Sequence, residues 1–198
     1  MAPSLLLFPR IMRLLSALFC ILCISFGHAA LGAPSSAEIL AEINLARTAP
    51  RTYARLLENR STRPTAAVRE AIRFLERATP LAPLQMAAGM INAASSHVAR
   101  QGPSGSRGHG NMSGRLSRHG QWIGSAGENI YYGTTDARGV VCALIVDEGV
   151  RGRGHRKNIF SAKFRVAGVA CGPHARYGAM CVQDFAGGWM ERGTLAGL

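Results

Sequence analysis

The sequence lacks the signatures of several enzyme and scaffold classes. It contains no Gly-x-Ser-x-Gly motif, no short local zinc-binding motif and no internal repeat. Hydrolysis through a serine held in that kind of turn is therefore disfavoured. A cysteine nucleophile is disfavoured as well, because the one candidate, Cys142, lies within an apolar run, where a thiol stays protonated.

Acidic residues are also scarce. Eleven Asp and Glu stand against 23 Lys and Arg, which gives a formal net charge of +12. Many of the arginines are dispersed through the N-terminal half, at positions 47, 51, 55, 60, 63, 69, 73 and 77. No RNA-reading motif or helix-turn-helix signature accompanies them, so we expect no nucleic-acid partner. Two explanations of the charge stay open: contact with an anionic cell-envelope surface, or solubility alone.

A long apolar run occurs at the N-terminus. Arg10 and Arg13 precede an apolar stretch from Leu14 to Phe26, and small residues follow at positions 29, 30, 32 and 33. The stretch has about 13 residues, fewer than the roughly 20 that a membrane-spanning helix needs. The pattern predicts a secretory signal peptide over residues 1–33, with an uncleaved anchor as the alternative. Removing it takes the formal charge from +12 to +10 and leaves residues 34–198 as one secreted or periplasmic domain.

Three of the five cysteines follow the predicted signal peptide. Cys171 and Cys181 flank a Gly-Pro loop between two apolar runs, an arrangement typical of a β-hairpin. The ends of a hairpin can come within disulfide distance, so we expect these two to pair in an oxidising compartment. Cys142 is then a buried small hydrophobic residue.

Helices are expected first along the chain and strands late. Ser35 and Glu38 form a capping box, and apolar residues follow at helical spacing. The stretch from Gln101 to Gly114 is rich in Gly and Ser and predicts a long loop that carries a site. The expected helices cover about residues 36–49, 53–57, 68–79 and 84–100, and the expected strands cover residues 165–171 and 179–185. The apolar run at residues 138–147 could be a helix or a buried strand, and we favour a helix. This order predicts an α+β fold.

Candidate functional side chains lie at glycine-flanked positions. His109 lies between two glycines, Glu128 follows Gly127, and His155 follows Gly154. Asp147 and Glu148 precede Gly149, and either could be a second acid. Imidazoles and carboxylates at such bends could bind a divalent cation or perform acid/base chemistry.

The residues and the order of several motifs resemble those of the CAP superfamily of cysteine-rich secretory, antigen 5 and pathogenesis-related proteins, and of its bacterial SCP-like members in particular. The resemblance extends from about Ser36 to Gly187. The motifs that carry it are the opening helix Ile39–Arg47, Pro83-Leu84 with Ala93–His97, Gly127-Glu128-Asn129-Ile130, Gly154–Ile159 and Val166–Val169.

The resemblance implies a three-layer α-β-α sandwich with an antiparallel sheet, and a cleft that carries two histidines and two acids. Carried over to this chain, these are His109, Glu128, Asp147 and His155, with Glu148 as the alternative to Asp147. The two imidazoles could hold Zn²⁺ or another divalent cation. Glu128 also has a purely structural interpretation, as a buried carboxylate that accepts backbone hydrogen bonds.

Two functions follow as hypotheses. The first is a secreted binding module for a lipid or a cell-envelope ligand, and the second is a metal-assisted hydrolase of envelope peptide or glycan. We favour the binding module, because a site with two histidines is weaker than a three-ligand catalytic zinc site. Of the remaining histidines, we expect His97 to be structural and both His119 and His174 to lie at the surface.

Overall fold

The computed structural model describes residues 33–195. The predicted signal peptide lies outside the described residues except for its last position. The helices are α1 Ser36–Thr48, α2 Pro50–Asn59, α3 Ala66–Arg77, α4 Ala88–Ser104, α5 Met112–His119, α6 Ala137–Val146, α7 Gly154–Ile159 and α8 Arg192–Leu195. The strands are β1 Gln85–Met86, β2 Gly120–Tyr132, β3 Val166–His174 and β4 Gly178–Glu191.

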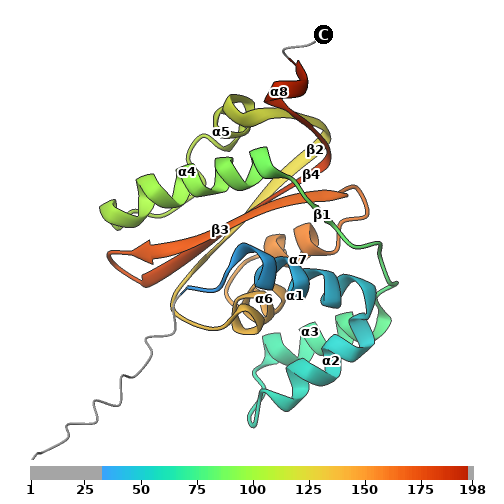
Figure 1. The fold of residues 1–198 in the computed structure, drawn as a ribbon. Helices are drawn as coiled ribbons and strands as arrows, with labels where there is room; N and C mark the ends of the chain where they lie inside the picture. The colour runs from blue at the N-terminus through green and yellow to red at the C-terminus, as the bar shows by residue number, and fades with distance from the viewer. Residues whose placement is uncertain (1–32, 196–198) are drawn as a thin grey trace, which may run out of the picture. The chain divides into compact units, whose positions relative to one another are not determined.

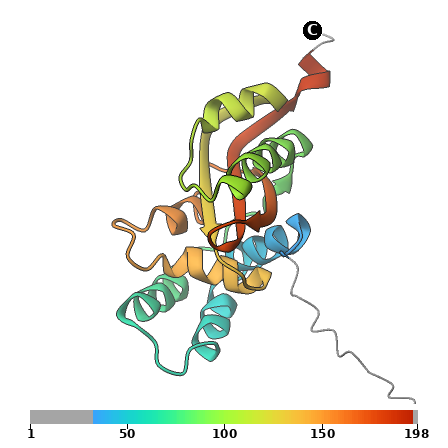
Figure 2. The ribbon, with the colours of Figure 1, turned by 90° about the vertical axis from the view of Figure 1, so that its left-hand side faces the viewer.

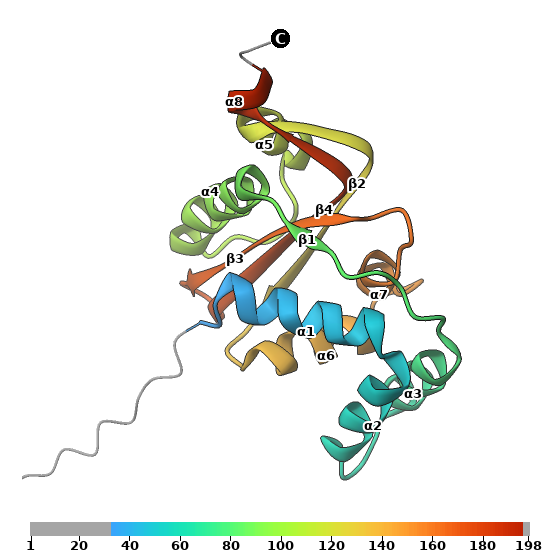
Figure 3. The same ribbon diagram turned by 45° about the vertical axis from the view of Figure 1, so that its right-hand side comes forward.

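Helices cover both faces of one four-stranded sheet (Figure 1). Helices α4 and α5 pack on one face, and α1, α6 and α7 pack on the other. Helices α2 and α3 lie beyond α1, farther from the sheet (Figure 3). The approach of α4 to β3 is close, since a side chain on Gly168 would clash with the backbone of Met90 and Ile91. The predicted α+β fold with helices on both sides of a sheet is confirmed.

The sheet is mixed, so the expectation of a wholly antiparallel sheet was wrong. Its strand order is β1-β3-β4-β2, in which β1 runs parallel to β3 and the other pairs are antiparallel. Strand β1 is held by bonds from the amide of Gln85 to Arg165 O (2.9 Å) and from that of Ala87 to Ala167 O (3.0 Å). A strand of two residues is too short to show the alternating pattern of a β-strand. This segment was instead predicted to be the start of the helix that begins at Ala88.

Helix α1 begins and ends as its sequence indicates. The hydroxyl of Ser35 accepts a hydrogen bond from the Glu38 amide (3.2 Å), and the Glu38 carboxylate accepts one from the Ser35 amide (2.8 Å). Further along, the Asn44 side chain both donates to Leu84 O (3.0 Å) and accepts from Leu84 N (2.7 Å). These bonds fix the segment that enters β1 against α1.

The larger hydrophobic core lies on the α1 side of the sheet. Buried residues of α1, α2, α3 and α6 pack there against β3 and β4. Cys171 and Cys181 face each other across the β3–β4 hairpin and form the expected disulfide, and Cys142 is free and buried as expected. Among residues 33–195, no helix combines the length and the apolar character that crossing a membrane requires.

Three segments of the structure differ from expectation. Part of the predicted loop is helical, because α4 continues to Ser104 and α5 begins at Met112. The expected turn around Gly127 is instead the middle of β2, and the expected bend at His155 belongs to α7. The glycines that indicated bends in β2 occupy an edge strand, where side chains need not alternate between core and solvent.

Candidate functional site

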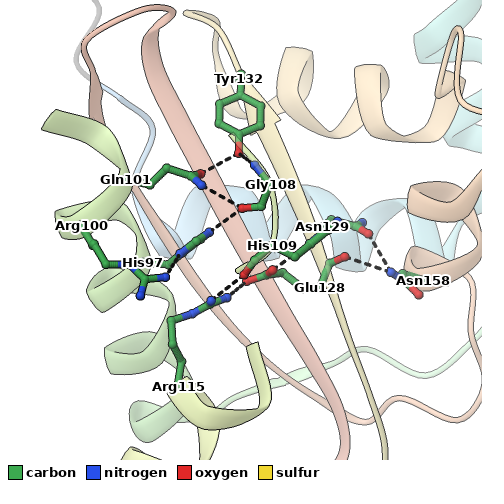
Figure 4. Close-up of polar contacts among 10 residues, drawn as sticks. All are labelled: His97, Arg100, Gln101, Gly108, His109, Arg115, Glu128, Asn129, Tyr132 and Asn158. Atoms are coloured by element: carbon green, nitrogen blue, oxygen red, sulfur yellow. Dashed lines mark hydrogen bonds and ion pairs between the residues drawn. The ribbon is translucent and has the colours of Figure 1, made fainter. Parts of the chain in front are cut away.

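Glu128 is the centre of a buried polar cluster on the α4 side of the sheet (Figure 4). Its Oε1 lies 2.8 Å from Nδ1 of His109. Its Oε2 accepts a hydrogen bond from Nη2 of Arg115, whose side chain is 1% exposed. A second nitrogen of Arg115, Nη1, donates to the backbone carbonyl of His109 at 2.6 Å. Arg115 therefore neutralises the buried carboxylate and also anchors the loop that carries His109.

The loop before His109 is held by the residues around Gly108. The carbonyl of Gly108 lies 2.9 Å from Nε2 of His97 and accepts from Nε2 of Gln101 (2.8 Å). Its amide donates to the hydroxyl of Tyr132 (2.9 Å), which in turn donates to Oε1 of Gln101 (2.6 Å) (Figure 4). Gly108 and Gly110 have φ angles of 107° and 56°, so the backbone on each side of His109 favours glycine.

His155 is paired with Asp147 on the other side of the sheet edge. Its Nδ1 lies 2.6 Å from Oδ1 of Asp147, and its backbone amide donates to Oδ2 of the same carboxylate at 2.9 Å. Asp147 is 3% exposed and ends α6 in the left-handed conformation (φ 52°). Glu148 is exposed and does not hydrogen-bond to His155 among the described residues.

Two asparagines connect the two histidine–carboxylate pairs. Asn158 on α7 donates to Oδ1 of Asn129 (2.9 Å) and to the carbonyl of Glu128 (3.3 Å) (Figure 4). Asn129 itself donates to the carbonyl of His155 at 3.1 Å. Neighbouring residues of a strand point to opposite faces, so Glu128 faces α5 while Asn129 faces α7. Because β2 is an edge strand, the two pairs flank that edge from its two sides.

Both histidines use Nδ1 for a carboxylate and keep Nε2 for another partner. The hydrogen bond to Glu128 raises the pKa of His109, and it outweighs the effect of partial burial, which lowers that pKa. His97, which touches the same loop, has a lowered pKa because it is buried. The side chains of His109 and His155 are 56% and 24% exposed, so solvent reaches both rings.

This donor set suits weak cation binding. A carboxylate on the far nitrogen of an imidazole fixes the ring and makes the free nitrogen a better ligand, as in many zinc sites. Among residues 33–195, however, no group of three or more His, Cys, Asp or Glu side chains is arranged to hold one metal ion. Each pair therefore offers one imidazole nitrogen to a cation, and further positions would be left to water or to a partner molecule.

Two residues of the site were not identified from the sequence. Arg115 stands where bacterial members of the family also have an arginine, but no role was predicted for it, because most arginines are solvated. Asp184 lies opposite Glu128 in the β2–β4 register, and neither of its carboxyl oxygens has a hydrogen-bond partner among the described residues. Burial and the charge of Glu128 raise its pKa well above 3.8.

The other histidines differ in their surroundings. His97 is buried and holds the Gly108 loop, which agrees with the structural role expected for it. His119 is half-buried beside the Ser96 hydroxyl. His174 is 2% exposed and lies 2.8 Å from Ser106 O, so the expected surface position was wrong. The hairpin folds against the end of α4, and a polar loop sequence does not reveal such a contact.

Comparison with known proteins agrees with this fold. Residues 40–185 match the profile of the cysteine-rich secretory protein family, CAP. No curated protein sequence matches the chain. Among solved structures, the chain is similar to a cysteine-rich secretory protein from Staphylococcus aureus, with 13% identity and a TM-score of 0.44 over 78% of this chain. The match spans 40% of that protein's length. The family profile covers most of the present chain, which therefore belongs to the cysteine-rich secretory protein (CAP) family.

Proposed function

We propose that the protein is an extracellular binding module in which His109 and His155 take up a divalent cation reversibly. The observation that carries this proposal is the matched hydrogen bonding of the two rings. Each Nδ1 is engaged by a buried carboxylate, Glu128 or Asp147, and each Nε2 is left for a ligand.

The carboxylates act in this proposal as positioning residues and not as metal ligands. Glu128 already accepts from Arg115 as well as His109. Asp147 accepts from both the ring and the backbone amide of His155. Each of the four carboxylate oxygens already accepts one hydrogen bond, and their role is to fix the tautomer and the direction of each imidazole.

A cation held by two imidazoles exchanges more readily than one in a closed site, and its uptake requires neutral rings. Catalytic zinc sites usually have three protein ligands, and the described part of the chain offers no third donor at this place. This favours the binding module over the metal-assisted hydrolase. The open positions of the cation would be available to a donor group of a partner molecule.

The test is calorimetric titration of the protein with Zn²⁺ at pH 7.5. We expect one site per chain in the wild type and loss of binding in both His109→Ala and His155→Ala. The matched control is His119→Ala, which removes another partly exposed imidazole and should bind as the wild type does. If either site variant retains wild-type affinity, or if the control loses it equally, the two-histidine site is refuted.

A further inference from the structure

A groove lined by basic residues runs between α3 and the segment that joins α6 to α7. A cavity of about 650 Å³ lies between Glu70 and Phe74 on one side and residues 149–153 with Arg156 and Lys157 on the other. It shares Glu70, Phe74 and Arg156 with an adjoining cavity of about 370 Å³ that extends along α3 to Arg77. Figure 2 shows the segment before α7 projecting beside α3. We call this surface the basic groove.

The charge of the groove is almost entirely positive. Its lining contains one carboxylate, that of Glu70, and six cations, which are Arg73, Arg77, Arg151, Arg153, Arg156 and Lys157. Glu70 pairs with Arg153 (2.6 Å) and Arg156 (3.0 Å), and these bonds lower its pKa to about 2, so it stays ionised. The other four cations form no ion pair with the described residues.

The floor of the groove is fixed by hydrogen bonds. Arg156 is buried and donates to the carbonyls of Ile145 and Val146, while its guanidinium lies 5.3 Å from the ring centre of Phe74. Arg153 donates to the carbonyl of Asp147 at 2.6 Å. These two arginines are therefore held in place before any ligand arrives, which lowers the entropy that binding must lose.

Exposed arginines recur along the face of α3 that borders the groove. Arg69, Arg73 and Arg77 are exposed on α3 at spacings of four residues, so like charges are neighbours along one helix face. Pairs of like charge at this spacing destabilise a helix. Glu70 and Glu76 lie three residues from Arg73 and offset part of this repulsion, and Arg77 lies in the last helical turn, where a positive charge is favourable.

We propose that the basic groove binds an extended polymer that carries phosphate groups and no bases. Its anionic groups would lie along Arg73, Arg77, Arg151 and Lys157. The groove is concave, which suits a single chain better than a membrane surface. Binding of single-stranded nucleic acid also needs open aromatic faces for stacking, whereas the one lining ring, Phe74, is covered by Arg156 and contacts Phe160 edge to face. The proposal uses neither histidine and stands whether or not a cation binds.

Inorganic polyphosphate is the probe, and its affinity for the full chain is measured at several salt concentrations. The test variant is the double substitution Arg73→Gln/Arg77→Gln, in which both residues are exposed and unpaired in the described structure. The matched control is Arg118→Gln/Arg176→Gln, which removes the same charge from exposed positions outside the groove. Melting temperatures should change little in either variant, since all four residues are exposed.

We expect the test variant to bind roughly 10- to 30-fold more weakly at about 0.1 M salt. Its plot of log affinity against log salt should be shallower by about 1.4, since each neutralised phosphate on a single strand contributes about 0.7 to the slope. The control should change affinity by less than about 3-fold. Equal losses in both variants, or no binding by the wild type, would overturn the proposal. So would tighter binding, at equal phosphate concentration, of phosphatidylglycerol vesicles or of oligothymidylate.

Discussion

The carboxyl group of Asp184 on β4 lies directly across the sheet from that of Glu128 on β2, and both side chains are buried. The two acids share one environment but differ in their partners. Glu128 is bonded to Arg115 and His109, whereas Asp184 has no hydrogen-bond partner among the described residues. Burial and the charge of Glu128 hold the pKa of Asp184 well above 3.8, so Asp184 keeps its proton at pH values where an ordinary aspartate has lost it.

The fold should therefore tolerate Asp184→Asn, and the stability of this variant relative to wild type should increase as the pH rises. Above about pH 4 the unfolded chain has lost the Asp184 proton while the folded chain keeps it, so this group makes the wild type less stable with increasing pH. The amide has no such titration. We expect the melting temperature of Asp184→Asn relative to wild type to increase from pH 5 to pH 8. A constant and large destabilisation over this range would show that the ionised carboxylate is required.

Replacing Glu128 with Ala should destabilise the fold through Arg115. The Glu128 carboxylate bonds to the side chains of His109 and Arg115 instead of the backbone amides that the structural interpretation predicts. Its removal leaves a guanidinium that is 1% exposed without a counter-charge, which costs about 3–5 kcal/mol. The free energy of unfolding in urea measures this cost. The double variant Glu128→Ala/Arg115→Met should be less destabilised than the sum of its single variants, and additive effects would contradict the pairing.

The pH below which cation binding weakens should depend on Glu128. The hydrogen bond to Glu128 raises the pKa of His109, and a protonated imidazole cannot bind a metal ion. Zinc affinity should therefore fall as the pH decreases through this raised value, which lies above 6.5. In Glu128→Gln the His109 pKa should be lower and the loss of affinity should move to lower pH. Nuclear magnetic resonance titration of the His109 ring, with the His119 ring as internal control, gives the pKa in both proteins.

The sequence predicts the helices well where they have one buried face. In α3, Val68, Ile72 and Leu75 recur at helical spacing. Residues 138–147 are apolar almost throughout, so their pattern also allowed a buried strand; the helix favoured there is observed as α6 within one residue of the expected bounds. Strand β2 was not predicted, because its first half is rich in glycine and its exposed residues do not alternate with buried ones. An edge strand with one side open to solvent need not carry the strand pattern.

The same limit applies to the candidate site. The glycine-flanked motifs and the family resemblance identified His109, Glu128, Asp147 and His155, and the structure joins them as two separate histidine–carboxylate pairs. Which acid pairs with which histidine depends on contacts between distant elements. The role of Arg115 depends on such contacts as well, since its burial results from the packing of α5 against β2. A sequence pattern records local spacing and does not report these distances.

Arg47, a residue of the motif in α1 that resembles the CAP superfamily, links α1 to two distant segments of the chain through its guanidinium. It is 2% exposed, and burial lowers its pKa. Its guanidinium donates to the carbonyls of Ala82 (3.1 Å), Ile159 (2.6 Å), Ser161 (3.1 Å) and Phe164 (3.2 Å). One side chain on α1 thus holds the segment before β1 and the end of α7, which carries His155.

Arg47→Met keeps most of the apolar volume but leaves these four carbonyls without their donor. At about 1–3 kcal/mol for each buried group that stays unpaired, and with water able to reach some of them, we expect a loss of about 3–5 kcal/mol in the urea unfolding free energy. Arg47→Lys should restore little stability, because a single ammonium group cannot reach four carbonyls that are arranged around a planar guanidinium. The control is Arg55→Met on α2, whose side chain is exposed and should matter by less than about 0.5 kcal/mol. If Arg47→Met is as stable as this control, Arg47 does not hold the α7 segment in place, and the position of His155 must depend on Asn129 and Asp147 alone.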